Sequence, residues 1–538
     1  MGTLRAFIRL FFFLLLAASL ALPAEGQRLL RGGCTPSIIN EVVAPQTANA
    51  RQIRQPNSLR LLPPKTSWDP DRIYRQLVIL VEPSDMPFQD NHTRDFYDKI
   101  LNTPGYNEGL GPGSVADYFR EQSGGLFNPV FDVFGPYKVS QKAQPYETPT
   151  SKTRNYGSAS MTEAGKQFFA EHPDLDYEQY DWNGDGTIDQ TIFIFAGYCG
   201  NQGADSFGYL WPSTSTLSIK GSVDGQRMAW YSCSAELWLT DESCGIGTIC
   251  HEYSHCFGLP DVYPTASSSD YYSVFDEWDL MDGGNFTNWG WCPPNYTAQE
   301  KMYLGWLNPI ELKEPVTITG MKSVSDGGEA YIIKHTDSEY LLLENRQQTA
   351  WDAYTPGKGL LITHINFNAT AWRDNLVNAQ LDNFPYFRYD IVHADNLDYE
   401  QWDDLIAERN EDDWLDDYDH LYNRHLSTSP YPWQTDSTDF VNCMLTDTSV
   451  PAATTYTANA EGRKLLSKTI TNIQMSPDGL ISFDFMGGTT AVSAVRSVGD
   501  HTPEAYFDLS GHRFSSPPAT PGIYIVRYTD GTTKKCIR

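Results

Sequence analysis

The segment from Gly247 to Asp261, with the sequence GTICHEYSHCFGLPD, constrains the fold of this 538-residue chain more than any other. His251 and His255 stand four residues apart, and this spacing places both side chains on one face of an α-helix. We therefore expect a helix over about residues 247–257. Gly258 can adopt the left-handed backbone that ends a helix, and the proline two residues later cannot continue one. The chain must turn back toward the two imidazoles just after the helix.

Two neutral imidazoles on one helix face can bind a single zinc ion. The turn brings Asp261 back toward such an ion, and a carboxylate oxygen is an ordinary third ligand. Glu277 and Asp282 are alternative third ligands from farther along the chain. Glu252 lies beside the ion, where it can take a proton from a water molecule that the metal makes more acidic. The alternative is a buried helix whose histidines only satisfy local hydrogen bonds, or a lapsed active site.

A second signal follows about twenty residues after the last expected ligand. Residues 278–284 read WDLMDGG, which places Met281 in a tight, glycine-rich turn. The turn resembles the Met-turn that lies beneath the metal in metzincin peptidases. Its methionine would pack under the ligands without binding the ion. Simple core packing would explain a lone methionine equally well. The metal-binding motif about twenty residues before it favours the Met-turn.

Together these segments resemble the immune inhibitor A family of secreted bacterial zinc metallopeptidases, relatives of the metzincins. The matching stretches are HEYSHCFGLPDVY at 251–263, EWDLMDGG at 277–284, KMYLGWLNP at 301–309, DWNGDGTIDQTIFIFAG at 181–197, EYLLLENRQ at 339–347 and GKGLLITHIN at 357–366. The resemblance covers about residues 75–400. It implies a zinc endopeptidase with His251, His255 and Asp261 as ligands and Glu252 as general base.

The cysteines beside the two histidines depart from the pattern of the family. The chain has nine, an odd number, and Cys250 and Cys256 flank the two histidines. These two face different directions on a helix and cannot easily pair with each other. Five cysteines fall between Cys233 and Cys292, and export would make disulfides there plausible. No CxxC pair exists, which argues against a cysteine-built zinc knuckle.

The loop at residues 181–189 spaces oxygen donors at every second position. The donors that match the opening of a calcium-binding loop are Asp181, Asn183, Asp185, Thr187 and Asp189. The twelfth position is an isoleucine and a strand is expected next, so this is no full EF-hand. The sequence predicts a structural calcium ion here, and a plain turn before a strand is the alternative.

The N-terminus predicts export. Two arginines precede an uncharged apolar run at residues 10–22, with cleavage expected after Ala24 or Gly26, so residues 1–26 read as a signal peptide. No other stretch is long and apolar enough to cross a membrane, so we expect no transmembrane segment in the mature chain. Residues 27–70 read as a pro-segment or linker. Cys34 there could cap the zinc, although a disulfide or a free thiol is favoured.

The remaining pattern predicts an α+β protein. A metzincin-like peptidase domain with an active-site helix is expected over residues 71–310, and a β-rich accessory domain over 311–486. Residues 487–538 read as a linker and a small β tail. This tail resembles the C-terminal sorting module of type IX secretion, which implies the bacterial export machinery as a partner and a secreted or surface location. A simple β-hairpin appendage would give the same pattern.

The formal net charge of −29 argues against nucleic acid as a partner. The acidic stretch at residues 403–419 is interpreted as a solvated face, with a calcium site as the sharper alternative. The expected function is that of a secreted zinc endopeptidase acting on proteins or peptides. A catalytically lapsed, calcium-stabilised surface binding protein is the main alternative, and a metal-dependent hydrolase of non-peptide substrates is a third.

Overall fold

The computed structural model describes residues 68–265, 273–381, 383–402, 426–434, 441–488, 503–508, 512–520, 523–528 and 533–537. The expected signal peptide, nearly all of the expected pro-segment with Cys34, and the acidic stretch 403–419 lie outside these ranges. Within them, none of the helices has the length and apolar character that crossing a membrane requires.

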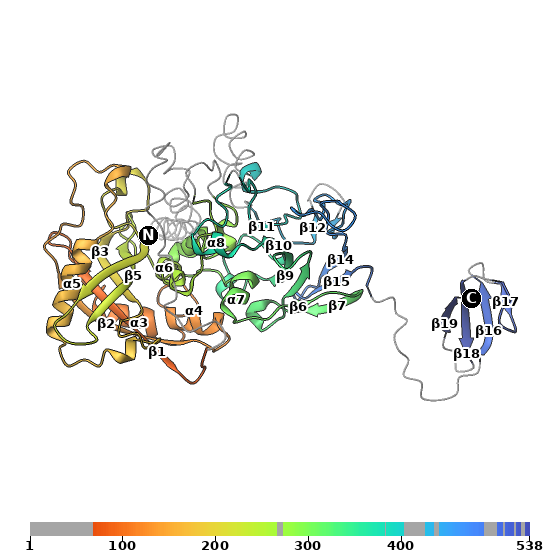
Figure 1. Ribbon diagram of the computed structural model, residues 1–538, viewed down its shortest axis with the longest axis horizontal. Helices are drawn as coiled ribbons and strands as arrows, with labels where there is room; N and C mark the ends of the chain where they lie inside the picture. The colour runs from red at the N-terminus through yellow and green to blue at the C-terminus, as the bar shows by residue number, and fades with distance from the viewer. Residues whose placement is uncertain are drawn as a thin grey trace, which may run out of the picture.

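The architecture is mixed α/β, with several sheets and few helices (Figure 1). The helices are α3 (Arg94–Asn102), α4 (Val115–Gln122), α5 (Ser158–Glu171), α6 (Gly247–Ser254), α7 (Ala298–Leu304) and α8 (Ala369–Arg373). The strands of the first sheet are β1 (Ile73–Glu82), β2 (Asn128–Lys138), β3 (Thr191–Tyr198), β4 (Ser213–Lys220) and β5 (Arg227–Leu237). The strands of the second sheet are β6 (Ile310–Glu311), β8 (Tyr331–Lys334), β9 (Glu339–Arg346), β10 (Gly359–Asn366) and β11 (Tyr389–Ile391). Smaller sheets contain β7 (Val316–Met321), β12 (Trp433–Gln434), β13 (Val441–Asn442), β14 (Ile470–Met475), β15 (Ile481–Phe485), β16 (Pro503–Asp508), β17 (Arg513–Phe514), β18 (Ile523–Tyr528) and β19 (Thr533–Ile537).

The first sheet has the order β2-β1-β3-β5-β4. Its first four strands are parallel, and β4 pairs antiparallel with β5 at the edge. Alternate residues of β1 enter two different hydrophobic cores: Val78 and Leu80 face the core shared with α3, α4 and α6, and Leu77 and Ile79 face the core shared with α5. Because both faces are covered, the strand reads as an unbroken apolar run.

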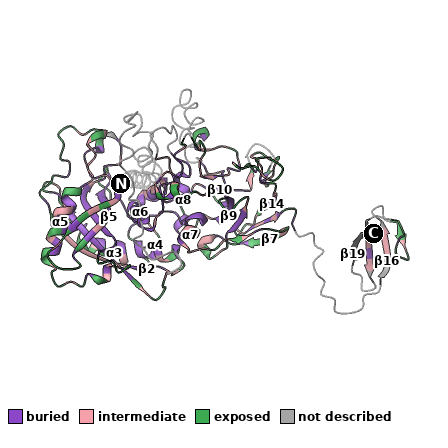
Figure 2. Cartoon of the chain, viewed as in Figure 1, coloured by how far each residue is buried: buried purple, intermediate pink, exposed green. Residues whose placement is uncertain are grey.

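The larger core continues past residue 310 into the second sheet, which has the order β11-β10-β9-β8-β6. Ile332, Leu342 and Leu361 point into it from one face of that sheet. Their neighbours Ile333 and Leu343 point the other way, into a third core shared with the sheet β14-β15-β7. Buried residues accordingly run without a break from the first sheet to the second (Figure 2). The strands that follow residue 310 therefore help to build the surroundings of α6.

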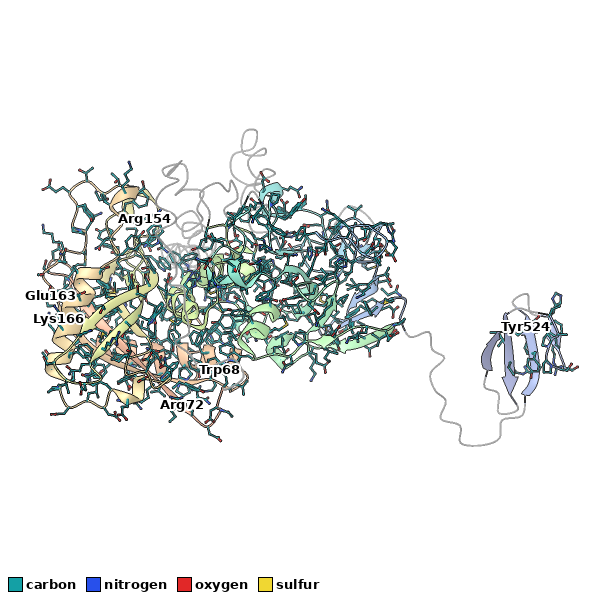
Figure 3. All side chains as sticks on the ribbon, viewed as in Figure 1. Trp68, Arg72, Arg154, Glu163, Lys166 and Tyr524 are labelled. Carbon is teal, nitrogen blue, oxygen red and sulfur yellow. The ribbon has the colours of Figure 1, made fainter. Side chains whose placement is uncertain are left out.

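Two further features concern the first and last described parts of the chain. Trp68, labelled in Figure 3, donates a hydrogen bond from Nε1 to the carbonyl of Leu304 at 2.9 Å, which joins the first described residue to the end of α7. At the other end of the chain, β16 to β19 form a separate four-stranded antiparallel sheet in the order β17-β16-β18-β19. The strand-rich tail expected from the sequence therefore forms.

Export makes disulfides plausible between residues 233 and 292, and the structure shows the state of four of the cysteines there. Cys233, Cys250, Cys256 and Cys292 are buried free thiols. Each thiol is surrounded by other residues. For example, the Cys292 thiol lies 3.5 Å from the carbonyl oxygen of Trp351. A free cysteine in such surroundings behaves as a small hydrophobic residue.

Candidate metal centre

Helix α6 and the 3₁₀ turn His255–Phe257 that continues it carry both histidines, as the spacing predicts. Gly258 ends the turn in the left-handed conformation, with φ of +84°, and its N–H donates to the carbonyl of His255. A residue with a Cβ would be strained there. The chain then reverses, and Asp261 returns to the helix face that carries the two imidazoles.

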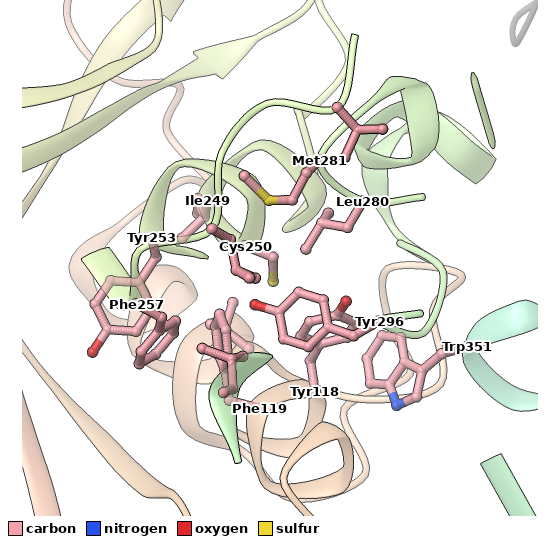
Figure 4. Close-up of a cluster of buried hydrophobic side chains, with 14 of the residues drawn as sticks. Tyr118, Phe119, Ile249, Cys250, Tyr253, Phe257, Leu280, Met281, Tyr296 and Trp351 are labelled. Atoms are coloured by element: carbon pink, nitrogen blue, oxygen red, sulfur yellow. The ribbon is translucent and has the colours of Figure 1, made fainter. Parts of the chain in front are cut away.

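The opposite face of α6 fixes its position. Cys250, Tyr253 and Phe257 enter a dense cluster with Tyr118 and Phe119 of α4 (Figure 4). The Tyr253 hydroxyl also donates to Gln76 Oε1 of β1 at 2.8 Å. Because aromatic rings fill one face of the helix, the imidazoles are held on the other face. Burial of this kind stabilises a helix too short to be stable alone.

His251, His255 and Asp261 form one group whose nitrogen and oxygen ligand atoms all lie within 4.8 Å of one another. Asp261 Oδ1 is 3.3 Å from His251 Nε2 and 3.3 Å from His255 Nε2. The three residues are only 4–6% exposed. Asp261 Oδ1 is buried without a hydrogen-bond partner. An unpaired carboxylate oxygen facing two imidazole nitrogens is a costly arrangement that a bound cation would satisfy, so these residues fit a metal ion.

Each ligand is oriented by an outer partner. His251 Nδ1 lies 2.8 Å from the carbonyl oxygen of Leu280, and His255 Nδ1 lies 2.8 Å from that of Leu259. A carbonyl oxygen can only accept, so each Nδ1 carries the proton and each Nε2 is left to face the group. Asp261 Oδ2 accepts a hydrogen bond from Asn375. Outer partners of this kind fix ring orientation and raise ligand basicity.

Without a metal, His251, Asp261 and Glu252 shift one another's pKa values. Burial lowers the pKa of His251, but Asp261 and Glu252 outweigh burial and raise this pKa to about 9. Burial raises the pKa of Asp261, but the two imidazoles more than offset this and hold the pKa well below its ordinary value. In the metal-free group a negative Asp261 carboxylate thus lies beside a protonated His251, and a divalent cation would take the place of that proton.

Glu252 lies beside the group and outside it. Burial raises the pKa of Glu252, while His251 and His255 oppose that shift. Thr214 of the edge strand β4 contacts Glu252 twice, with its hydroxyl 2.6 Å from the backbone carbonyl oxygen and 3.1 Å from Oε2. Tyr263 lies close to the same charges, and burial together with Asp261 and Glu252 holds its pKa well above the ordinary value. Its phenol therefore stays protonated.

The two alternative third ligands do not join the metal-capable group. Glu277 lies in the 3₁₀ turn Asp276–Trp278. Both Asp282 oxygens are already engaged, Oδ1 by the hydroxyl of Ser273 and Oδ2 by two backbone N–H groups. Asp282 thus stabilises the turn before Met281.

Met281 is fully buried in the turn that follows. Its carbonyl accepts from the Val262 N–H at 2.9 Å, and its own N–H donates to Asp279 Oδ1 at 2.7 Å. Met281 belongs to the same hydrophobic cluster as Ile249 and Cys250 of α6 (Figure 4). The turn therefore packs against the helix that carries the histidines.

In the expected calcium loop, the carboxylates accept hydrogen bonds from the loop itself. Asp181 accepts from the N–H groups of Gly184, Asp185 and Gly186, and the Asp185 carboxylate accepts from that of Thr187. The two Asp189 oxygens accept from the Asn183 amide and the Trp182 N–H. Burial raises the pKa of Asp189 to about 8, and the charges of Asp181 and Asp185 add to this shift. Within the described residues, the three aspartates do not bring their oxygens together as a metal-capable group.

Two imidazoles and a carboxylate around one point, with a further acid beside them, are typical of metal-dependent hydrolases. Residues 69–306 match the family model of the immune inhibitor A peptidase M6 catalytic domain. This match supports a metallopeptidase function for that part of the chain. No curated protein matches the chain.

Two residues at this centre were absent from the sequence interpretation. Thr214 contacts Glu252 from 38 residues upstream, and Asn375 contacts Asp261 from 114 residues downstream. Neither belongs to a motif, and each arrives through the pairing of distant strands and loops. Only the fold could reveal them.

Proposed function

We propose that this protein is a secreted, zinc-dependent endopeptidase. The observation that carries the proposal is the unpartnered Oδ1 of Asp261, placed 3.3 Å from both histidine Nε2 atoms. The donor set of two imidazoles and one carboxylate is typical of catalytic zinc. The match of residues 69–306 to a metallopeptidase family model supports the same conclusion.

Zinc at this group would polarise the scissile carbonyl and make a water molecule more acidic. Glu252 would then accept a proton from the attacking water and donate it to the leaving amine. Its raised pKa makes the carboxylate a stronger base for the first transfer, and the proton it takes is then available for the leaving amine. Thr214 holds the Glu252 carboxylate in place from β4. The protonated Tyr263 phenol can donate a hydrogen bond nearby.

The position of β4 supports a peptide as the substrate. This strand ends the order of the first sheet, so one of its backbone edges has no strand partner in that sheet. An extended peptide can pair with such an edge through main-chain hydrogen bonds. Thr214 links the same strand to Glu252, so a peptide paired along β4 would bring its backbone close to the general base. Recognition through the backbone suits cleavage within a chain.

The test compares the wild-type protein with Glu252→Gln in a protein-cleavage assay, with and without a zinc-selective chelator. We expect chelation to abolish wild-type cleavage and Glu252→Gln to lower kcat by about 10²- to 10⁴-fold with zinc content unchanged. Glutamine keeps the shape of the side chain and cannot act as a base at neutral pH. Equal turnover in the two proteins would exclude this mechanism and favour the lapsed binding protein. A panel of small esters would expose a preference for non-peptide substrates.

Two finer features belong to the same proposal. The turn around Met281 would act as a metzincin-type Met-turn, because it packs against α6 and ties itself to Val262. Residues 1–26 would be removed on export, residues 27–70 would form a pro-segment or linker, and the C-terminal tail would engage the type IX machinery. N-terminal sequencing of protein from the culture medium should find cleavage after Ala24 or Gly26. Retention of residue 1 inside the cell would contradict export.

We also propose a structural calcium ion at residues 181–189, supported by the alternation of oxygen donors. Its binding would have to displace the proton that the raised pKa of Asp189 retains. Isothermal titration of the metal-free protein with calcium tests this. We expect one site, lost in Asp189→Asn, and heat of binding unchanged by that substitution would contradict the assignment.

A further inference from the structure

Asp261 has two oxygens in different surroundings. Oδ1 faces the imidazoles without a hydrogen-bond partner, whereas Oδ2 accepts from Asn375 Nδ2 at 2.6 Å. The Asp261 backbone N–H in turn donates to Asn375 Oδ1 at 2.7 Å. The Asn375 amide therefore forms hydrogen bonds with both the backbone and the carboxylate of Asp261. Such a pair of bonds fixes both the place of the Cα atom and the rotation of the side chain.

Asn375 is itself firmly held. It is 4% exposed and follows α8 in the left-handed conformation, with φ of +56°. Asparagine tolerates this conformation better than most residues, and it is common just after a helix. The carbonyl of Asn375 also accepts from the Thr265 hydroxyl. The amide is thus presented to Asp261 by a backbone that is fixed on both sides.

A second asparagine ties the same segments together without touching the metal ligands. Asn378 Nδ2 donates to the carbonyl of Val262 at 2.8 Å and to that of Tyr389 at 2.7 Å. Its Oδ1 accepts from the N–H groups of Arg388 and Tyr389. This buried amide uses all of its hydrogen-bonding capacity for structure. It provides a matched comparison for Asn375.

We propose that Asn375 is a positioning residue of the metal centre, which holds Asp261 so that only Oδ1 is offered to the ion. This inference rests on the proposed zinc function. Asn375 lies outside residues 69–306, the part that matches the peptidase family model. The segment between α8 and β11 therefore completes a site whose ligands all lie within the matched part. The metal centre would depend on the second sheet as well as on the first.

The test measures zinc affinity of the full chain by competition with a chromophoric chelator, with zinc alone as the probe. Asn375→Gly keeps the left-handed backbone at no cost and removes the whole amide. Asn375→Asp keeps an oxygen to accept the Asp261 N–H but removes the donor to Oδ2. We expect either variant to bind zinc about 10- to 100-fold more weakly, the usual effect of losing an outer partner of a ligand. Asn378→Ala should lower the melting temperature but leave zinc affinity within about threefold of wild type.

The outcomes separate the two proposals. If the wild-type protein binds zinc and both Asn375 variants bind it within threefold, the positioning role is wrong and the zinc site stands. If Asn378→Ala loses affinity as much as Asn375→Gly, the effect is general loosening of the segment, and the specific role is again wrong. If the wild-type protein binds no zinc, the proposed function itself fails, and this inference fails with it. Should Asn375→Gly not fold, Asn375→Asp, with the same bulk, carries the comparison.

Discussion

The group around Asp261 and the loop at residues 181–189 use the same chemical group in opposite ways. Asp261 leaves Oδ1 without a hydrogen bond, although it is buried between two imidazoles. In the loop, backbone N–H groups occupy the Asp181 carboxylate, and the Asp189 oxygens also have donors. The first arrangement leaves a charge-bearing atom unsatisfied, whereas the second completes a turn by itself.

The difference separates a carboxylate that keeps one oxygen free of hydrogen bonds from carboxylates that a turn already uses. Both were predicted from spacing alone. A carboxylate whose two oxygens already accept hydrogen bonds gains less from a cation than one that keeps an oxygen without a donor. We therefore expect zinc to be required for activity and calcium to affect stability alone.

The largest effect should follow from exchanging each aspartate for its isosteric amide. Asp261→Asn should lower peptide cleavage by at least about 10³-fold, because losing the metal removes several kcal/mol of transition-state stabilisation. Asp189→Asn should leave kcat/KM within about threefold of wild type. Cleavage assays with parallel measurement of bound zinc check both. A comparable loss of cleavage in Asp189→Asn would erase the contrast between the two regions.

The sequence was informative where the chemistry is local. The four-residue spacing of the histidines, the glycine after the helix and the return to Asp261 are all set within fifteen residues, and α6 and its left-handed end follow that prediction. These features depend on backbone preferences that neighbouring residues determine.

Long-range features were beyond such reasoning. The contacts of Asn375 and Thr214 depend on which strands pair, and no spacing rule encodes that. Cys233 and Cys292 are free thiols although export would permit disulfides, because pairing also needs two sulfurs in contact. The change in sequence pattern near residue 310 also gave no sign that the residues before and after it share one hydrophobic core.

The stability of the protein should depend on pH through Asp189 in the loop at residues 181–189. The pKa of Asp189 is raised to about 8 from an ordinary value of 3.8, so the folded protein holds a proton that the unfolded chain releases. The contribution of Asp189 to stability is therefore full below about pH 4, falls as pH rises through about 8, and is lost above it. The total change could reach about 5 kcal/mol.

Urea unfolding of the metal-free protein between pH 5 and pH 9 measures this slope. Asp189→Asn, which cannot ionise, should flatten it. Asp181→Asn is a useful comparison, because it leaves the ionising group in place and removes one neighbouring negative charge, so it should reduce the slope without abolishing it. An unchanged slope in Asp189→Asn would show that the loop does not hold this proton.

Packing provides a third contrast. Met281 is fully buried against α6, and Asn183 is an exposed residue of the loop. Met281→Ala should lower the free energy of unfolding by about 3 kcal/mol, because it leaves a cavity under the helix. Asn183→Ala, which removes two hydrogen bonds near the surface, should cost about 1 kcal/mol. Denaturant titrations of both variants give the two values, and equal losses would mean that Met281 contributes no more to stability than the exposed Asn183.

Calcium binding should also stabilise the folded protein, and the dependence of this effect on pH makes it diagnostic. At a concentration of a hundred times the dissociation constant, a ligand specific for the folded state stabilises it by about 2.7 kcal/mol. Calcium must compete with the proton on Asp189, so the gain should be larger at pH 9 than at pH 6. Melting curves with and without calcium at both pH values test this, with Asp189→Asn as the variant that should not respond. A calcium effect that is equal at both pH values, or that persists in Asp189→Asn, would place the ion elsewhere and leave residues 181–189 as a turn stabilised by its own hydrogen bonds.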